Sequence, residues 1–241
     1  MSSLNDKIIL FVGGAVGIGR AAAHLCAQRG AQVIIADLDA QQGQKTAAET
    51  GGVFFPVNIT DPASVQSLAQ QIAARFERVD VLIHTAGILQ GAFESLDEFS
   101  PETFRRVLDV NVTGTFLVVQ QIVPLLRKAR RGVLILTSSG AATGGSSSFA
   151  YGSSKGAVNS FAITLTNRLE AEGMRVNVLS PGNIDTAMKR SVIAADVQRR
   201  GADFEKAVAD SHLGDPAGVA KILAFLASDD ADYVRGVIST R

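Results

Sequence analysis

The chain has little of what disulfide, metal or nucleic-acid chemistry requires. Its 241 residues include one cysteine, Cys26, and three histidines, so an intramolecular disulfide is excluded and a His/Cys metal cluster is not expected. Lys and Arg together number 23, as do Asp and Glu, which gives a formal net charge of zero. The clustered positive charge that binds DNA, RNA or an acidic membrane is therefore missing. We expect no metal and no nucleic-acid partner, whereas near-zero charge permits self-association.

Long apolar runs and a leader are also missing. Residues 1–7 are polar and lack the apolar core of a signal peptide. No stretch approaches the roughly 18 apolar residues of a membrane span. The sequence therefore predicts a soluble, cytoplasmic protein with no membrane partner. The length suits one domain, and no repeat, charge block or linker divides the chain, so we predict a single domain over residues 1–241.

Short apolar runs rich in Val, Ile and Phe recur along the chain and predict strands. They are Ile8–Val12, Val33–Ala36, Val53–Val57, Val79–Ile83, Val133–Leu136, Val176–Leu179 and Val237–Ile238. Uncharged runs of this kind are typical of strands buried on both faces of a parallel sheet.

Helix signals lie between these runs. Pro follows a capping residue at Asp61, Ser100 and Asp215, predicting helices to about Phe76, Lys128 and Ala227. The alternation predicts an α/β fold, a doubly wound, Rossmann-like parallel sheet of about seven strands with helices on both faces.

A glycine-rich turn follows the first predicted strand directly. Gly13-Gly14-Ala15-Val16-Gly17-Ile18-Gly19 leads into an alanine-rich helical pattern over Arg20–Gln28. Such a turn lets backbone approach a phosphate, and the helix N-terminus offers free N–H groups and partial positive charge. The spacing is G-x-x-x-G-x-G rather than G-x-G-x-x-G, so a simple tight turn is an alternative. Its place between the first strand and first helix favours a dinucleotide site.

Asp37 ends the second predicted strand, 18 residues beyond Gly19. In a Rossmann unit an acidic residue about 20 positions on binds the adenosine ribose hydroxyls. A carboxylate there would repel the 2′-phosphate of NADP, and Val16 offers no cation to offset this. We therefore favour NAD over NADP, with a surface-loop role for Asp37 as the alternative.

Tyr151 and Lys155 are four residues apart at the start of a predicted helix, so both lie on one face. A neighbouring ammonium lowers the pKa of a phenol, which would make Tyr151 usable as a proton donor and acceptor. Ser138 lies 13 residues before Tyr151, at the carboxyl end of a predicted strand, where open α/β sheets bind ligands. The alternatives are that Tyr151 and Lys155 form an exposed surface pair and that Ser138 is a serine of a turn.

The glycine turn, the Ser138…Tyr151-x-x-x-Lys155 spacing and Asn111 together resemble the short-chain dehydrogenase/reductase family in its single-domain form. The likeness extends over about residues 7–238. It implies that Ser138 polarises the reacting oxygen and that Tyr151 is the general acid or base. It also implies that Lys155 tunes Tyr151 and holds the nicotinamide ribose, and that Asn111 supports a water relay. Ser139 is the reserve candidate, because the register of this Ser-rich loop can differ by one.

The same resemblance assigns residues to the cofactor. Pro181-Gly182 matches the turn beside the nicotinamide, with Ile184 and Thr186 placed for its carboxamide and the phosphates. Asn58 follows the third strand, where it can accept a hydrogen bond from the adenine amine. The full predicted set is Gly13, Gly17, Ile18, Gly19, Asp37, Leu38, Asn58, Ile59, Ala86, Gly87, Tyr151, Lys155, Pro181, Gly182, Ile184 and Thr186.

Two departures from the family pattern stand out. The chain has His84-Thr85-Ala86-Gly87 where the family usually has Asn-Asn-Ala-Gly, and we interpret His84 as a structural substitute rather than a second base. The family also usually continues past its last strand with Asp-Gly-Gly, whereas this chain ends at Thr240-Arg241. This early end is explained either by a truncated chain or by an altered subunit contact at this place.

The sequence predicts an NAD-dependent oxidoreductase that moves a hydride between nicotinamide and a secondary alcohol or ketone. An NADP-dependent ketoreductase and a non-catalytic dinucleotide-binding sensor or partner subunit are the alternatives. Residues 187–212 are expected to form a substrate lid, with Leu89, Gln90 and Phe93 on the opposite wall. The resemblance and the apolar segments Phe116–Leu126 and Ala157–Leu169 predict a homo-oligomer, a tetramer or a dimer.

Overall fold

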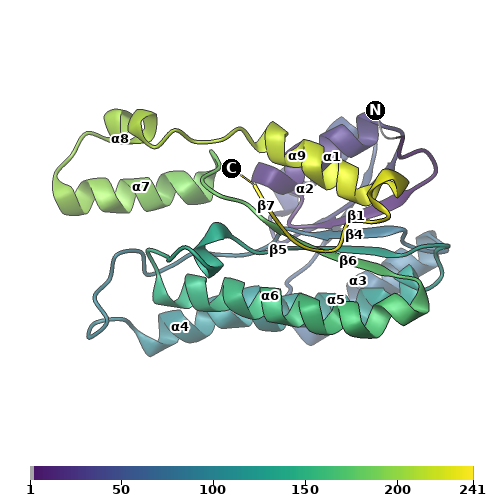
Figure 1. Cartoon of the computed structure of the whole chain (residues 1–241). Helices are drawn as coiled ribbons and strands as arrows, with labels where there is room; N and C mark the ends of the chain where they lie inside the picture. The colour runs from purple at the N-terminus through teal and green to yellow at the C-terminus, as the bar shows by residue number, and fades with distance from the viewer. Residues whose placement is uncertain (1–2, 241) are drawn as a thin grey trace.

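A seven-stranded parallel sheet forms the centre of the molecule. The computed structural model describes residues 3–240. Within them the strands are β1 (Ile8–Val12), β2 (Gln32–Asp37), β3 (Val53–Pro56), β4 (Val81–His84), β5 (Val133–Thr137), β6 (Arg175–Ser180) and β7 (Gly236–Ser239). Their spatial order is β3-β2-β1-β4-β5-β6-β7. The predicted doubly wound α/β fold is confirmed, with β4 starting two residues later than expected and including His84 (Figure 1).

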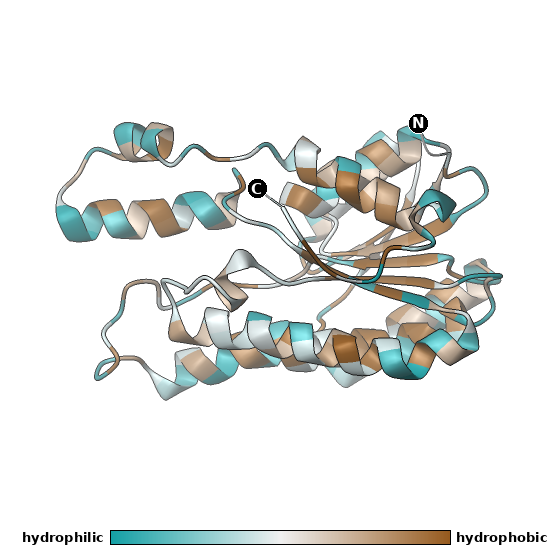
Figure 2. Ribbon diagram, in the orientation of Figure 1, coloured by the Kyte–Doolittle hydropathy of each residue, from teal (hydrophilic) through white to brown (hydrophobic). Residues whose placement is uncertain are grey.

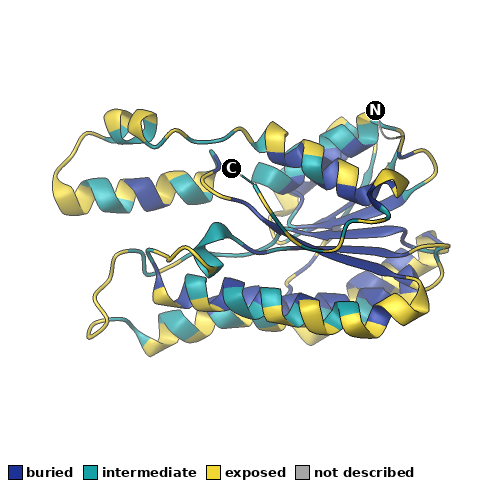
Figure 3. Cartoon of the chain, viewed as in Figure 1, coloured by how far each residue is buried: buried dark blue, intermediate teal, exposed yellow. Residues whose placement is uncertain are grey.

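Helices cover both faces of the sheet. The helices α1 (Gly17–Gln28), α2 (Ala40–Thr50) and α9 (Pro216–Ala227) pack on one face. The helices α3 (Pro62–Arg75), α5 (Thr115–Leu126) and α6 (Phe149–Leu169) pack on the other. Successive strand residues point to opposite faces, so both Ile9 and Leu10 are fully buried, in separate apolar layers. Figures 2 and 3 show that the central strands are buried and mostly apolar, which is why the sequence has uncharged apolar runs there; the buried Asn177 in β6 is an exception.

The predicted helix from Ser100 to Lys128 is continuous but changes its winding. It consists of α4 (Pro101–Leu108), a π-helical segment η1 (Asp109–Gly114) and α5. In η1 the Thr115 hydroxyl donates to the Asn111 carbonyl at 2.7 Å, which competes with the regular backbone pattern. π-helical turns of this kind are frequent at functional sites.

The helix Pro101–Leu126 is also the one helix among residues 3–240 that is long and apolar enough to cross a membrane. Half of its most apolar window is buried within the fold, however, and Val118 and Ile122 pack against the sheet. A core helix has this same composition.

Two helices extend beyond the carboxyl ends of the strands. They are α7 (Ala187–Arg200) and α8 (Phe204–Asp210), and they occupy the segment predicted as a lid. Figure 1 shows α7 reaching outward from the same end of the sheet as the loop before α4.

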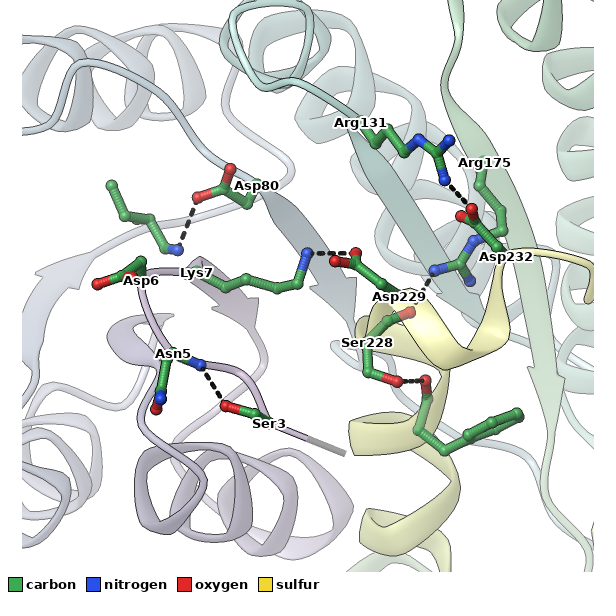
Figure 4. A network of polar contacts seen from close by, with 12 residues as sticks. Ser3, Asn5, Asp6, Lys7, Asp80, Arg131, Arg175, Ser228, Asp229 and Asp232 are labelled. Carbon is green, nitrogen blue, oxygen red and sulfur yellow. Dashed lines mark hydrogen bonds and ion pairs between the residues drawn. The ribbon is translucent and has the colours of Figure 1, made fainter. Parts of the chain in front are cut away.

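A polar network ties the opposite end of the sheet together (Figure 4). The Lys7 ammonium pairs with Asp229 at 2.8 Å, and the buried Arg175 donates to the Ser228 carbonyl at 3.1 Å. The Ile8 N–H donates to the Asp80 carboxylate at 2.8 Å. This end is closed by protein contacts, which leaves the carboxyl ends of the strands as the place for a ligand.

Candidate active site

A cavity of about 700 Å³ lies at the carboxyl ends of the strands. The chain leaves β1 toward β2 and later returns to place β4 on the other side of β1, so the cavity sits at a topological switch point. Its volume falls in the range of about 300–1,000 Å³ that is usual for ligand sites. All sixteen predicted cofactor residues and Ser138 line it, whereas Asn111 lies behind its wall.

The glycine turn is dictated by close contact with the end of β4. Gly13 has a φ of +86°, and a Cβ on it would lie 2.3 Å from the Ala86 nitrogen. A Cβ on Gly19 would lie 2.2 Å from the Gly13 carbonyl oxygen. The Thr85 hydroxyl donates to that same carbonyl at 2.9 Å, which fixes the turn from the β4 side. These glycines are therefore required by the backbone geometry of the site.

The N-terminus of α1 opens into the cavity without a cap. Its N-cap residue is Val16, and neither a side-chain cap nor a first-turn acidic residue is present among the described residues. By contrast, Asp, Ser or Thr side chains cap α2, α3, α4, α6, α7, α8 and α9. Free N–H groups and the helix dipole suit an anion, so the residues present fit the pyrophosphate of a dinucleotide.

Asp37 lies at the end of β2 with its carboxylate in the cavity wall. One carboxylate oxygen accepts from the Ala15 N–H at 3.0 Å and the other from the Asp39 N–H at 3.1 Å. These bonds join the carboxylate to the glycine turn and hold it where the adenosine ribose of a dinucleotide would bind.

The adenine side contains Leu38, Asn58 and Ile59, as predicted, and Asn58 already makes local hydrogen bonds. Its Oδ1 already accepts from the Thr60 N–H at 3.1 Å and the Thr60 hydroxyl at 2.8 Å. An amide oxygen of this kind has two lone pairs. Asn58 also offers Nδ2 as a donor to a base, and acceptance by Oδ1 from the adenine amine stays a prediction.

Tyr151 meets Ser139, not Ser138. The Ser139 side chain is close enough to the Tyr151 phenol to lower its pKa, and both side chains line the cavity. The buried Ser138 hydroxyl instead donates to the Lys155 carbonyl at 2.9 Å. The reason is the extended backbone after β5, where neighbouring side chains point in opposite directions. The prediction of Ser138 as the primary serine is corrected, and the reserve candidate Ser139 takes its place.

Lys155 lies under the Tyr151 ring. Its ammonium is 5.6 Å from the ring centroid and donates to the Thr137 carbonyl at 2.9 Å. Burial lowers the pKa of Lys155 from 10.5 to about 8. Burial also raises the pKa of Tyr151, and the nearby Ser139 side chain opposes that rise. Lys155 is not among the groups that shift the pKa of Tyr151 in this arrangement, so the expectation that the ammonium lowers that pKa stays a prediction.

Asn111 uses its whole side chain to hold other elements. Its Nδ2 donates to the Ile88 carbonyl and the Ser154 hydroxyl, each at 2.9 Å. Its Oδ1 accepts from the Ile88 N–H at 2.8 Å. Its backbone carbonyl accepts from the Thr115 hydroxyl. Asn111 thus fastens the segment after β4 to α6, beside Lys155, and it does not enter the cavity wall.

His84 is buried at the end of β4, and its Nε2 has no hydrogen-bond partner among residues 3–240. Burial, and next the Lys155 charge, lower its pKa to about 3. A neutral imidazole in this position agrees with the interpretation of His84 as a structural residue.

The remaining walls come from the segments after β4 and β6. Thr186 caps α7 by accepting from the Lys189 N–H at 3.3 Å, and its methyl carbon lies 3.5 Å from where a Cβ on Gly17 would be. Leu89 and Phe93 line the cavity as predicted, whereas Gln90 does not. Met188, Lys189 and Val192, which lie in the segment predicted as a lid, also line the cavity. Arg106 of α4 lines it without having been predicted, because no local motif marks a residue that lines a cavity from a helix.

Comparison with known proteins agrees with this geometry. A family model described as "Enoyl-(Acyl carrier protein) reductase" matches residues 13–240. L-fucose dehydrogenase of Mus musculus is 33% identical over 228 residues, covering 93% of this chain and 83% of that protein. The 3-oxoacyl-(acyl-carrier-protein) reductase FabG of Escherichia coli K12 is 34% identical over 237 residues, covering 97% and 95%. A short-chain dehydrogenase structure from Escherichia coli CFT073, complexed with NADPH, gives a TM-score of 0.86 at 32% identity, covering 99% and 97%.

The fold and the site define a dinucleotide-binding α/β enzyme. With the matches above, the chain belongs to the short-chain dehydrogenase/reductase family, as its sequence predicted. It is an oxidoreductase, and its cofactor class is a nicotinamide dinucleotide.

Proposed function

We propose that this enzyme interconverts a secondary alcohol and a ketone with NAD(H), using Tyr151 as the acid–base group. The observation that supports this most is that Ser139 and Tyr151 lie together in the cavity lining, with the Lys155 ammonium 5.6 Å from the centroid of the phenol ring. All three side chains line the cavity into which the uncapped end of α1 opens. A protein that only senses a dinucleotide, the alternative from another class, does not need this arrangement.

The proton is handled by the chain itself. For reduction of a carbonyl, the Tyr151 phenol donates its proton to the carbonyl oxygen while the Ser139 hydroxyl polarises that oxygen. For alcohol oxidation the same groups act in reverse, with the phenolate taking the hydroxyl proton. The nicotinamide, when bound, supplies or accepts the hydride.

Substitutions at Ser139 and Tyr151 test this function. Tyr151→Phe removes the transferable proton and should lower turnover by about 10²–10⁴-fold. Ser139→Ala removes a donor to the developing oxyanion and should lower it by about 10²–10³-fold. Both should bind NADH nearly as the parent does, as measured by quenching or transfer of NADH fluorescence. Ser138→Ala is the contrast, since it loses its bond to the Lys155 carbonyl and should affect thermal stability more than turnover. Equal turnover losses at Ser138 and Ser139 would contradict the assignment.

For the cofactor we propose NAD rather than NADP. The support is Asp37, whose carboxylate is fixed by two backbone N–H groups at the end of β2 and would repel a 2′-phosphate. The similar structure from Escherichia coli CFT073 contains NADPH, which favours NADP as the alternative cofactor. Titration with NADH and NADPH should show tighter binding of NADH, and Asp37→Ala should narrow the difference. Equal affinities in the parent would overturn the proposal.

We also propose that α7 and α8 act as the substrate lid and that the enzyme is a homo-oligomer. The lid is supported by Met188 and Val192 of α7, which line the same cavity as Leu89 and Phe93. The oligomer is supported by large apolar side chains exposed on α5 and α6.

A further inference from the structure

The outer part of the cavity is bounded by a contact between two segments that are far apart in the sequence. Phe93, in the loop between β4 and α4, lines the cavity. The guanidinium carbon of Arg199, in the last turn of α7, lies 5.2 Å from the centroid of the Phe93 ring. Arg199 is not part of the cavity lining, so the ring separates the guanidinium from the cavity. Both segments extend from the same end of the sheet (Figure 1).

Phe93 is held in a conformation that an aromatic residue rarely adopts. Its φ is +65°, in the left-handed region, which is a genuine outlier for a bulky side chain. Its N–H donates to the Ser147 carbonyl at 2.7 Å. Next to it, the buried Ser148 hydroxyl donates to the Gln90 carbonyl at 2.6 Å. These bonds fix the loop to the start of α6, the helix that contains Tyr151, and strain maintained in this way is typical of ligand clamps.

The Arg199 side chain is oriented by Asp196 of the same helix, α7. Its Nη2 bonds to the Asp196 carboxylate at 2.8 Å. Arg200 bonds to the same carboxylate oxygen at 3.0 Å and makes no cation–π contact among residues 3–240. Arg199 and Arg200 therefore differ in the contact with Phe93 while sharing their acidic partner.

We propose that Phe93 and Arg199 form a latch that closes the outer end of the substrate cleft and limits the length of the substrate. The inference rests on the proposed function and narrows it, since the substrate becomes a compact ketone or secondary alcohol rather than a long chain. An exposed cation–π contact stabilises the closed state by about two- to fivefold, which is weak enough to open in every turnover. Lengthening a substrate past the latch costs that contact and displaces the Phe93 ring.

Hydrogen exchange measures the latch without any turnover. In the NADH complex, Arg199→Gln and Phe93→Leu should each speed exchange in α7 and in residues 89–96 by about two- to fivefold. Phe93→Leu keeps an apolar wall and removes the aromatic ring. Arg200→Gln is the matched control and should leave exchange unchanged. If Arg200→Gln accelerates exchange as much as Arg199→Gln, loss of an Asp196 partner explains the effect and the latch is wrong.

A series of straight-chain methyl ketones of increasing length measures the limit on substrate size. For the parent, kcat/KM should fall sharply beyond a certain length. Phe93→Ala should raise kcat/KM for the longest ketones relative to the shortest by about two- to fivefold, the factor by which the contact favours the closed state, whereas Arg200→Gln should leave the ratio unchanged. An unchanged ratio in Phe93→Ala would overturn the size limit even where exchange has increased. If the parent binds NADH but reduces no ketone, the proposed function fails, and the exchange result alone decides whether the latch exists.

Discussion

Lys155 is a cation placed where water scarcely reaches it. It is 5% exposed, and among residues 3–240 its ammonium donates to one carbonyl, that of Thr137. Burial moves its pKa from 10.5 to about 8, which corresponds to an unfavourable free energy of about 3 kcal/mol for holding the charged form in the fold. A charge kept at this cost points to a role in binding or catalysis rather than in stability.

Replacing Lys155 by Met should therefore separate stability from activity. At pH 7, Lys155→Met removes the buried charge and leaves the Thr137 carbonyl without its donor. The net result should be a gain in unfolding free energy of about 2 kcal/mol, measured by denaturant unfolding of the unliganded protein. Turnover and NADH affinity should both fall, because the ammonium no longer supports Tyr151 or a bound ribose.

The pH dependence provides the control for Lys155. A lysine whose folded pKa lies below its unfolded pKa destabilises the fold fully below pH 8, and the penalty disappears as pH rises from 8 toward 10.5. The stability difference between Lys155→Met and the parent should shrink over that interval. A variant that is less stable than the parent at pH 7 would show that the ammonium is a net stabiliser.

The direction in which the Ser138 and Ser139 side chains point could not be predicted from the sequence. Spacing from Tyr151 pointed to Ser138, but spacing along the chain does not determine which way a side chain points. The alternation at the end of β5 turns Ser138 toward α6 and Ser139 toward the phenol. The local bonds of Asn58 to Thr60 could not be predicted for a similar reason, because they depend on turn geometry.

At the scale of elements, the helix Pro101–Leu126 and α6 are joined to the segment after β4 by one side chain. Asn111 makes three hydrogen bonds from the π-helical turn, two to the backbone of Ile88 and one to Ser154. Ile88 and the neighbouring Gly87 both line the cavity. The position of this cavity wall therefore depends on Asn111 even though its side chain lies behind the wall.

Asn111→Leu should loosen this junction. The Ile88 N–H and carbonyl lose their partners, and the unfolding free energy should fall by about 2–4 kcal/mol, seen as a lower Tm. NADH affinity should fall as well, because the cavity wall is no longer held. Ser154→Ala, which removes one of the three bonds, should produce a smaller loss. A fall in kcat with Tm and NADH affinity unchanged would instead indicate a role of Asn111 in the chemistry alone.

The strands and the capped helices were predictable from sequence because their signals are local. Buried strands appear as uncharged Val/Ile runs, and Asp61, Ser100 and Asp215 each accept from the first turn of their helix as predicted. The change of winding in η1 was not predictable, because the side chain of Asn111 within it bonds to Ile88 and Ser154, which only the fold brings close.

At the scale of the whole molecule, the contacts that sequence could not predict join distant segments. Lys7 pairs with Asp229 across 222 residues, and the cation–π contact of Phe93 with Arg199 links the two sides of the cavity. No periodicity or spacing marks such partners. The glycine turn and the Tyr151/Lys155 pair were predictable because each lies within a few residues and matches a family motif.

The helices α5 and α6 expose large apolar side chains to solvent. Phe116 of α5 is 45% exposed and Ile163 of α6 is 55% exposed, on the outer side of helices that already bury an apolar stripe on the sheet. The Phe116 ring lies 6.0 Å from that of Phe161, so an aromatic pair spans the two helices at the surface. A second copy related by a two-fold axis can cover this face with the same residues, and the zero net charge does not oppose it.

We therefore expect Phe116→Glu to shift the protein toward a smaller species. Burying one Phe contributes about 1.5–3 kcal/mol, and a two-fold interface counts it twice, so dissociation should be favoured by at least about 10²-fold. Sedimentation velocity at micromolar concentration should show a tetramer or dimer for the parent and a lower mass for the variant. Leu96→Glu is the matched control, because Leu96 is 71% exposed but lies in the loop before α4. It should leave the mass unchanged. A parent that sediments as a sharp monomer at this concentration would exclude the interface, since the exposed apolar face of α5 and α6 would then be stable in water without a partner.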